Sequence, residues 1–173
     1  MSVTEIVLAP GASGTIERLH PHRDGLMERG LAVELLALPR GTAERALPVY
    51  RDAVPEGRRG SVAIGGQSFG GRVASMVAAE SAPAALVLMS YPLHAPGRHD
   101  AWHDRTAHWP AITCPVLLLS GEADPFARLD LLRQAVDRLP DATVHTWPAR
   151  GHGLTPVLED ALDRIVAFLR QRT

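Results

Sequence analysis

A serine surrounded by glycines is the first feature of this chain that could carry out chemistry. Ser68 lies in the stretch GGQSFGG, with Gly66 two residues before it and Gly70 two residues after it. The apolar run SVAI precedes this stretch and the segment RVASMVAAE follows it. A serine at a sharp strand-to-helix turn adopts an uncommon backbone conformation, and flanking glycines keep neighbouring backbone from colliding. The pattern predicts an exposed nucleophile, and its alternative is a glycine-rich turn that only lets a helix pack closely.

Two residues further along the chain could activate this serine. A hydroxyl is a weak nucleophile near neutral pH, so it needs a base, and the base needs an acceptor that orients it. Asp124 follows the apolar run PVLLLSG, and His152 follows the run TVHTWP. Ligands of open parallel sheets bind outside the carboxyl ends of the strands, so we expect Ser68, Asp124 and His152 to gather there. The order Ser, Asp, His is typical of acyl transfer with a serine nucleophile and a histidine base.

Other residues compete for these roles. Glu122 stands in the same loop as Asp124 and offers a second carboxylate, whereas Asp130 has the position of a helix cap or first-turn residue. His145 falls within a strand-like run and is expected to be a structural histidine. Cys114 adjoins an apolar run, so we expect a buried, unreactive thiol.

The elements that must position these side chains alternate along the chain. Apolar runs rich in Val, Leu and Ile predict strands at 5–10, 32–38, 61–66, 84–90, 115–121 and 143–148. Helical periodicity predicts helices at 15–28, 43–53, 70–80, 130–139 and 156–170. This alternation implies right-handed crossovers and a mainly parallel sheet covered on both faces. We expect a three-layer α/β/α sandwich with six strands, forming one domain over residues 1–173.

The stretch 91–113 is the one long irregular segment, and its composition suggests a polar loop or short cap that does not pack. It carries several groups that could bind a metal: His94, His99, His103, His108, Asp100 and Asp104. Their spacing is not that of a recognised ligand set, so a solvated loop and no metal are expected. Trp102 and Trp109 could either line a cleft or anchor the loop. His20 and His22 could contact substrate or belong to a polar helix face.

Composition and charge exclude several classes of function. The net charge is −1, and no basic stripe of the kind that nucleic-acid binding requires is found. All 18 basic residues are arginine, and neither lysine nor asparagine occurs, which excludes lysine Schiff bases, Walker-type phosphate loops and N-glycosylation. This bias is typical of a GC-rich bacterial genome. No leader and no membrane-length apolar run is seen, so a cytoplasmic protein with no membrane partner is expected.

The segments EIVLAPGASG, GGQSFGG, LLLSGEADPF and GHG together resemble the α/β-hydrolase superfamily, and they span nearly the whole chain. The resemblance is to a small, lid-poor branch near the dienelactone-hydrolase-like esterases and the testis-expressed and NSL-complex-subunit types. It implies an oxyanion hole formed by the N–H groups of Phe69 and Ala12. Ser13 is the alternative donor, because Pro10-Gly11 stands where relatives often carry His-Gly.

The same resemblance implies a serine hydrolase that needs no cofactor. It would cleave small soluble carboxylic esters, thioesters or lactones through an acyl-enzyme. The first strand leads directly to the expected oxyanion loop, and no helical insertion is apparent after the fourth strand, so we expect a minimal core with an open site. The alternative is a non-catalytic binding or scaffold protein that retains the fold. The sequence does not specify an oligomeric state.

Overall fold

The computed structural model describes residues 3–171 and contains one sheet in which every strand pairing is parallel. Its strands are β1 (Glu5–Ala9), β2 (Ala32–Leu35), β3 (Ala63–Gln67), β4 (Ala85–Met89), β5 (Val116–Gly121) and β6 (Ala142–Trp147). They lie in the order β2-β1-β3-β4-β5-β6. The neighbours of β1 are therefore β2 on one side and β3 on the other, and the loops that follow β1 and β3 diverge at this switch point. A crevice suited to ligands forms at such a point.

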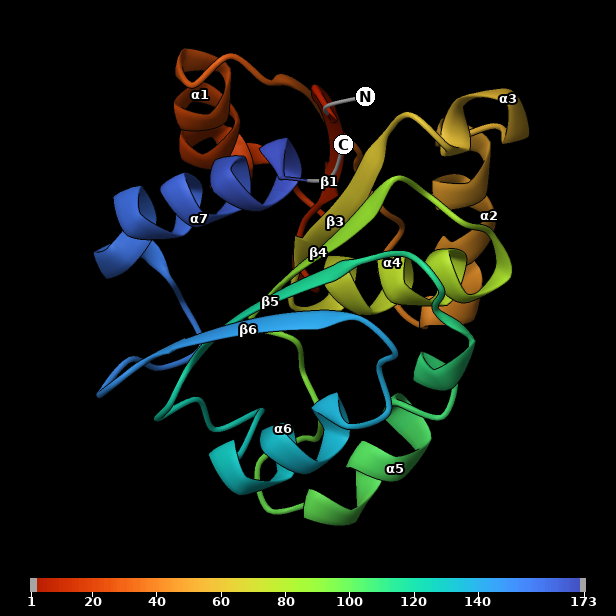
Figure 1. The fold of residues 1–173 in the computed structure, drawn as a ribbon. Coiled ribbons are helices and arrows are strands. Elements are labelled where there is room, and N and C mark those ends of the chain that lie inside the picture. The colour runs from red at the N-terminus through yellow and green to blue at the C-terminus, as the bar shows by residue number, and fades with distance from the viewer. Residues whose placement is uncertain (1–2, 172–173) are drawn as a thin grey trace.

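Helices cover both faces of the sheet (Figure 1). On one face lie α1 (His20–Glu28) and α7 (Leu158–Arg170), and on the other lie α2 (Ala43–Ala53), α4 (Phe69–Glu80) and α6 (Leu129–Val136). Two shorter helices are α3 (Glu56–Arg59) and α5 (Trp102–Arg105). Single 3-10 turns occur at Glu17–Leu19, His99–Ala101, Trp109–Ala111 and Thr155–Val157. The predicted three-layer sandwich is confirmed.

Alternation along the strands divides the core into two layers. Ile6 and Leu8 of β1 pack in the layer that α1 and α7 cover, whereas Val7 and Ala9 pack in the layer beneath α2 and α4. Every residue of β4 is buried, as expected of a central parallel strand that has helices on both faces. Continuous apolar runs of Val, Leu and Ile are therefore what this sheet requires.

All six predicted strands and all five predicted helices are present. The bounds of α2 are those expected, and α4 begins one residue earlier than expected. Helix α1 begins at His20 rather than at residue 15, because Pro21 occupies its first turn and a 3-10 turn precedes it. Helix α6 ends at Val136, three residues earlier than residue 139.

The expectation of an unpacked polar loop at 91–113 was wrong, as was that of no helical insertion after the fourth strand. This segment forms α5 and two 3-10 turns. Tyr91, Trp102 and Trp109 are buried in it, and the rings of Tyr91 and Trp109 meet edge to face with centroids 5.0 Å apart. The Tyr91 hydroxyl donates to the carbonyl of Arg105 at 2.6 Å. Large side chains at irregular spacing pack this segment on the core without producing a helical period.

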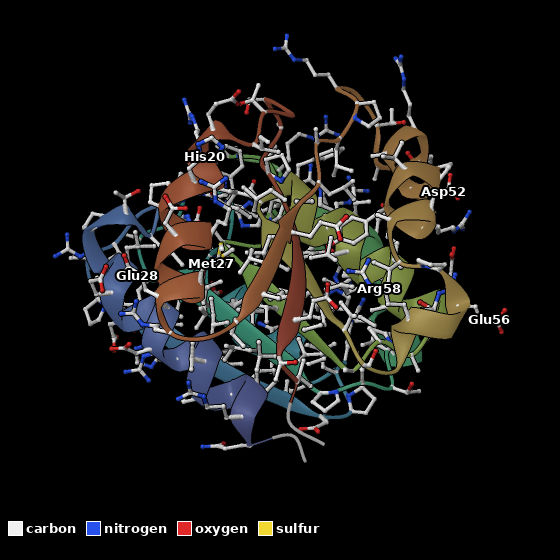
Figure 2. The ribbon with its side chains drawn as sticks, turned by 90° about the horizontal axis from the view of Figure 1, so that it is seen from above. His20, Met27, Glu28, Asp52, Glu56 and Arg58 are labelled. Carbon is white, nitrogen blue, oxygen red and sulfur yellow. The ribbon has the colours of Figure 1, made fainter. Side chains whose placement is uncertain are left out.

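Helix α3 is attached to the edge of the sheet by charge. Figure 2 shows Arg58 directed from α3 toward the strands, whereas Glu56 of the same helix points away. The Arg58 guanidinium pairs with Glu5 of β1 and lies 3.1 Å from Glu34 of β2. Within the described part of the chain, no helix is long and apolar enough to cross a membrane.

Candidate active site

Ser68 connects β3 to α4 in a backbone conformation that few serines adopt. Its φ is 50° and its ψ is −116°. The turn is fixed on both sides, since the Ser68 N–H donates to the carbonyl of Met89 at 2.8 Å and its carbonyl accepts from the N–H of Arg72 at 3.0 Å. Positive φ at a non-glycine residue costs free energy and persists only when the surrounding structure imposes it. This turn presents the hydroxyl at the carboxyl edge of the sheet.

Gly66 and Gly70 make this turn possible, as the sequence predicted. A Cβ on Gly66 would lie 2.6 Å from the carbonyl oxygen of Ala9. A Cβ on Gly70 would collide with the backbone of Ala9 and Pro10. Real Cβ atoms do not approach other atoms so closely, so only glycine lets the turn pack against the end of β1.

The structure brings Ser68, His152 and Asp124 together at this edge. Ser68 Oγ lies 2.8 Å from His152 Nε2, and His152 Nδ1 lies 2.8 Å from Asp124 Oδ2. The Asp124 side chain is fully buried, and its other oxygen accepts from the N–H of Phe126 at 2.8 Å. With the Nδ1 proton donated to Asp124, His152 Nε2 is left free to accept the hydroxyl proton of Ser68.

Hydrogen bonds between two loops hold the acid and the imidazole in place. The loop after β5 carries Asp124, and the loop after β6 carries His152. The Ala123 N–H donates to the carbonyl of Arg150 at 2.8 Å, which joins the two loops directly. The Phe126 ring lies against the imidazole of His152, with ring centroids 4.5 Å apart. These contacts fix the geometry of the site before any ligand binds.

Glu122, the competing carboxylate, points elsewhere. Its Oε1 accepts a hydrogen bond from the hydroxyl of Thr146 on β6 at 2.7 Å. Of the two acids in this loop, Asp124 is the one within hydrogen-bond distance of His152.

The remaining candidates have structural surroundings. Asp130 lies in the first turn of α6, where its bond with Arg128 lowers the pKa of its carboxyl to about 2. His145 lies 3.8 Å from Asp160 and packs edge-on against a tryptophan ring. Cys114 is buried, and burial raises the pKa of its thiol to about 12, so it cannot serve as a nucleophile near neutral pH.

A cleft of about 450 Å³ opens beside Ser68. Its lining comprises Gly11, Ala12, Ser13, Thr15, Arg18, Gln67, Ser68, Phe69, Arg72, Pro92, Arg105, Phe126 and His152. Ala12 and Phe69, the predicted oxyanion donors, therefore stand at the same cleft as the hydroxyl, and so does Ser13, the alternative. The volume lies in the lower half of the range that small-molecule sites occupy.

Three arginines of this cleft were missed in the sequence. Arg72 lies one helical turn after Ser68, and positions four residues apart share a helix face, so the spacing could have identified it. Arg105 comes from α5, in the segment that was expected to be a loop, and Arg18 comes from the 3-10 turn between β1 and α1. No local signal connects these two to Ser68.

Two of the loop histidines are not solvated, contrary to expectation. His94 is buried, and its Nε2 accepts from the N–H of Arg128 at 3.1 Å. His108 Nε2 lies 2.7 Å from Ser75 Oγ, and burial, followed by the charge of Arg72, lowers the pKa of His108 to about 4. Apolar packing of the segment carries these rings inward. In residues 3–171 no group of three or more side chains is arranged to hold a metal ion.

The other open assignments are decided by burial. Trp102 and Trp109 lie in the core beneath α4 and α6, so they anchor the segment rather than line the cleft. His20 and His22 belong to α1 and do not line the cleft. His22 is buried, and burial lowers its pKa.

A family described as an alpha/beta hydrolase domain matches residues 40–165, which include Ser68, Asp124 and His152. The chain belongs to the α/β-hydrolase domain family. Solved structures of similar fold cover nearly all of this α/β hydrolase. The monoacylglycerol lipase of Paleococcus ferrophilus has a TM-score of 0.84 and 17% identity over 98% of this chain and 95% of its own.

Two esterases show the same likeness. Est1E from Butyrivibrio proteoclasticus, solved with ferulic acid bound, has a TM-score of 0.79 and 16% identity over 99% of this chain and 90% of its own. The esterase Pf2001 of Pyrococcus furiosus has a TM-score of 0.76 and 15% identity over 98% of this chain and 81% of its own. At such identities the comparison establishes the fold. The narrower branch suggested by the sequence stays a prediction for this α/β hydrolase.

Proposed function

We propose that this α/β hydrolase is a serine hydrolase that cleaves small soluble carboxylic esters, thioesters or lactones through an acyl-enzyme. The observation that carries the proposal is the chain of two 2.8 Å contacts from Ser68 Oγ through the imidazole of His152 to the buried carboxylate of Asp124. The family and the structural neighbours named as esterases or lipases support it. No cofactor is needed for this chemistry.

In the first half of the reaction, Ser68 Oγ attacks the ester carbonyl carbon while its proton passes to His152 Nε2. The N–H groups of Phe69 and Ala12 stabilise the resulting oxyanion. Asp124 stabilises the imidazolium through the Nδ1 proton. Cleavage of the bond to the leaving group transfers the proton from His152 to that group and leaves an acyl-enzyme.

In the second half, water attacks the acyl carbon and gives a proton to His152. Breaking the bond to Ser68 Oγ then releases the acid and returns the proton to the serine. The cleft has apolar walls at Phe69, Pro92 and Phe126, which suit a short acyl or alcohol group. Its volume of about 450 Å³ favours small substrates over long acyl chains.

A fluorophosphonate probe tests the proposal, because it reacts covalently with activated serines. We expect labelling of the folded protein and none of Ser68→Ala. Ser75→Ala is the matched control, since Ser75 Oγ also lies 2.7 Å from a histidine nitrogen, that of His108, but is fully buried. It should be labelled like the wild type.

The outcome against the proposal is equally direct. If the probe did not label the wild type, or labelled Ser68→Ala as strongly as the wild type, Ser68 would be excluded as an activated nucleophile. Together with no turnover on a panel of short esters, thioesters and lactones, that result would favour the alternative of a binding or scaffold protein with this fold.

A further inference from the structure

The lining of the cleft beside Ser68 is positively charged. Arg18, Arg72 and Arg105 line it, and no aspartate or glutamate is among its lining residues. Within residues 3–171, none of the three arginines forms a salt bridge with a carboxylate, whereas several surface arginines, such as Arg29 and Arg51, do. Asp124 is engaged by His152 and the N–H of Phe126, behind the imidazole.

Arg72 is poorly satisfied by the protein alone. Its Nε is buried and has no hydrogen-bond partner among the described residues. A buried donor of a charged group that lacks an acceptor is costly. Arg72 lies in the first turn of α4, so its backbone is fixed by the same turn that presents Ser68.

Arg105 places a second positive charge near Arg72 and so increases the cost of the poorly satisfied Arg72 guanidinium. Its Nη1 donates to the carbonyl of Pro92 at 2.9 Å, and its own carbonyl accepts from the hydroxyl of Tyr91, so the residue is held at the wall of the cleft. Burial, followed by the positive charge of Arg72, lowers the pKa of the Arg105 guanidinium. Two like charges that share one cleft destabilise the free protein, and an anion bound between them would remove this repulsion.

We propose that the cleft recognises esters that carry a second, anionic group, and that Arg72 and Arg105 bind that group while Ser68 attacks the ester carbonyl. The inference rests on the proposed function and names the substrate class. A carboxylate and a phosphate-type group share the required chemistry, because both accept paired hydrogen bonds from guanidinium groups. Arg18, which is exposed in the 3-10 turn before α1, adds to the field that attracts the anion.

The test compares kcat/KM for monoethyl succinate and ethyl 4-methylpentanoate, in which an isopropyl group replaces the carboxylate at the same position. We expect the wild type to prefer the hemiester by roughly tenfold to a hundredfold, as for a charge-assisted hydrogen bond in a partly buried site. Ethyl 3-phosphonopropionate distinguishes the two anions, since a preference for it over the hemiester would assign a phosphate-type group.

Arg72→Gln and Arg105→Gln should each lower the preference for the anionic ester at least several-fold. Arg133→Gln is the matched control, because it removes the same charge from an exposed position on α6 that does not line the cleft. It should keep the wild-type preference. The inference would be overturned if the wild type preferred the neutral ester. It would also be overturned if all three variants showed the same preference for the anionic ester.

A binding measurement separates this inference from the proposed function. In Ser68→Ala, calorimetry with monoethyl succinate should show binding that is weakened when Arg72→Gln is added, whether or not the wild type cleaves the ester. Binding without cleavage in the wild type would contradict the proposed function and support the anion site. Cleavage of neutral esters with no binding preference for the anion would support the proposed function and overturn the anion site.

Discussion

The carboxylate of Asp124 lies 2.8 Å from His152 Nδ1 and is fully buried, whereas 28% of the His152 side chain is exposed. The buried partner is thus fixed and the imidazole that must exchange protons reaches the cleft. Because the N–H of Phe126 also binds Asp124, at 2.8 Å, the negative charge of this carboxylate is compensated in its buried position. Asp124 can therefore hold the tautomer of His152 that leaves Nε2 facing Ser68.

Asp124→Asn should lower kcat by about a hundredfold to ten-thousandfold while the fold persists. An amide at this position favours the wrong tautomer of His152 and does not stabilise the imidazolium. Steady-state kinetics on a short ester, with circular dichroism to verify folding, measures the effect.

Glu122→Gln provides the control in the same loop, since Glu122 bonds to Thr146 and not to His152. Its kcat should stay within a few-fold of the wild type. If Glu122→Gln lost activity and Asp124→Asn did not, the carboxylate that orients His152 would have to be assigned to Glu122 instead of Asp124.

Gly70→Ala should destabilise the protein by about 1 to 3 kcal/mol or prevent folding, because the new methyl group would meet the backbone of Ala9 and Pro10. Gly57→Ala is the contrasting change, since nothing lies within 4 Å of a Cβ at this helical position. It should be neutral or stabilising by up to about 1 kcal/mol. Denaturant midpoints measure both, and similar midpoints would contradict the steric account of the turn.

The layered fold could be predicted from the sequence because buried parallel strands need continuous apolar runs. The run 84–90 contains β4, whose every residue is buried. Helix ends were less predictable, since capping depends on local geometry. Helix α1 begins only after a 3-10 turn and has Pro21 in its first turn. The packing of 91–113 could not be predicted, because Trp102 and Trp109 enter the core from short turns with no repeating period.

The candidate triad could be located because each member follows a strand and carries a distinctive residue type. The charge of the cleft could not, because it is a tertiary property. Arg72 and Arg105 are 33 positions apart in the sequence, and their approach depends on how the segment that carries α5 packs against α4 and α6. A chain whose basic residues are all arginine gives no compositional hint of which ones line a site.

Acidification should destabilise the protein partly through His108. Its pKa is about 4 in the folded protein, where burial and Arg72 disfavour the charged form, against about 6.5 for an unfolded histidine. Between these values the unfolded chain binds a proton that the folded protein does not, so the free energy of unfolding falls as the pH falls from about 6.5 to about 4.

The variant His108→Gln removes this titration and keeps an amide that can bond to Ser75. Urea unfolding at pH 7, 6 and 5 should show a weaker loss of stability on acidification in the variant than in the wild type. His22, whose pKa is also lowered by burial, acts in the same direction in both proteins and cancels from the comparison. Parallel losses in the two proteins would show that His108 is readily protonated in the fold.

Tyr50→Phe should be the costliest removal of a single hydroxyl from the core. Tyr50 projects from α2 and is fully buried, with its hydroxyl 2.7 Å from the carbonyl oxygen of Gly65 and 2.9 Å from that of Val7. The same hydroxyl accepts from the N–H of Gly65 at 3.0 Å, so it links α2 to both β1 and β3. Its removal leaves a buried strand N–H without an acceptor, which costs about 1 to 3 kcal/mol.

Tyr91→Phe is the matched comparison, because the Tyr91 hydroxyl donates to the carbonyl of Arg105 and its removal leaves no backbone N–H without an acceptor. The expected cost is about 0.5 to 1.5 kcal/mol. Guanidinium unfolding of both variants gives the two values under one set of conditions. A Tyr50→Phe protein as stable as Tyr91→Phe would mean that the N–H of Gly65 finds another acceptor, and that β1 and β3 do not depend on α2 for their alignment.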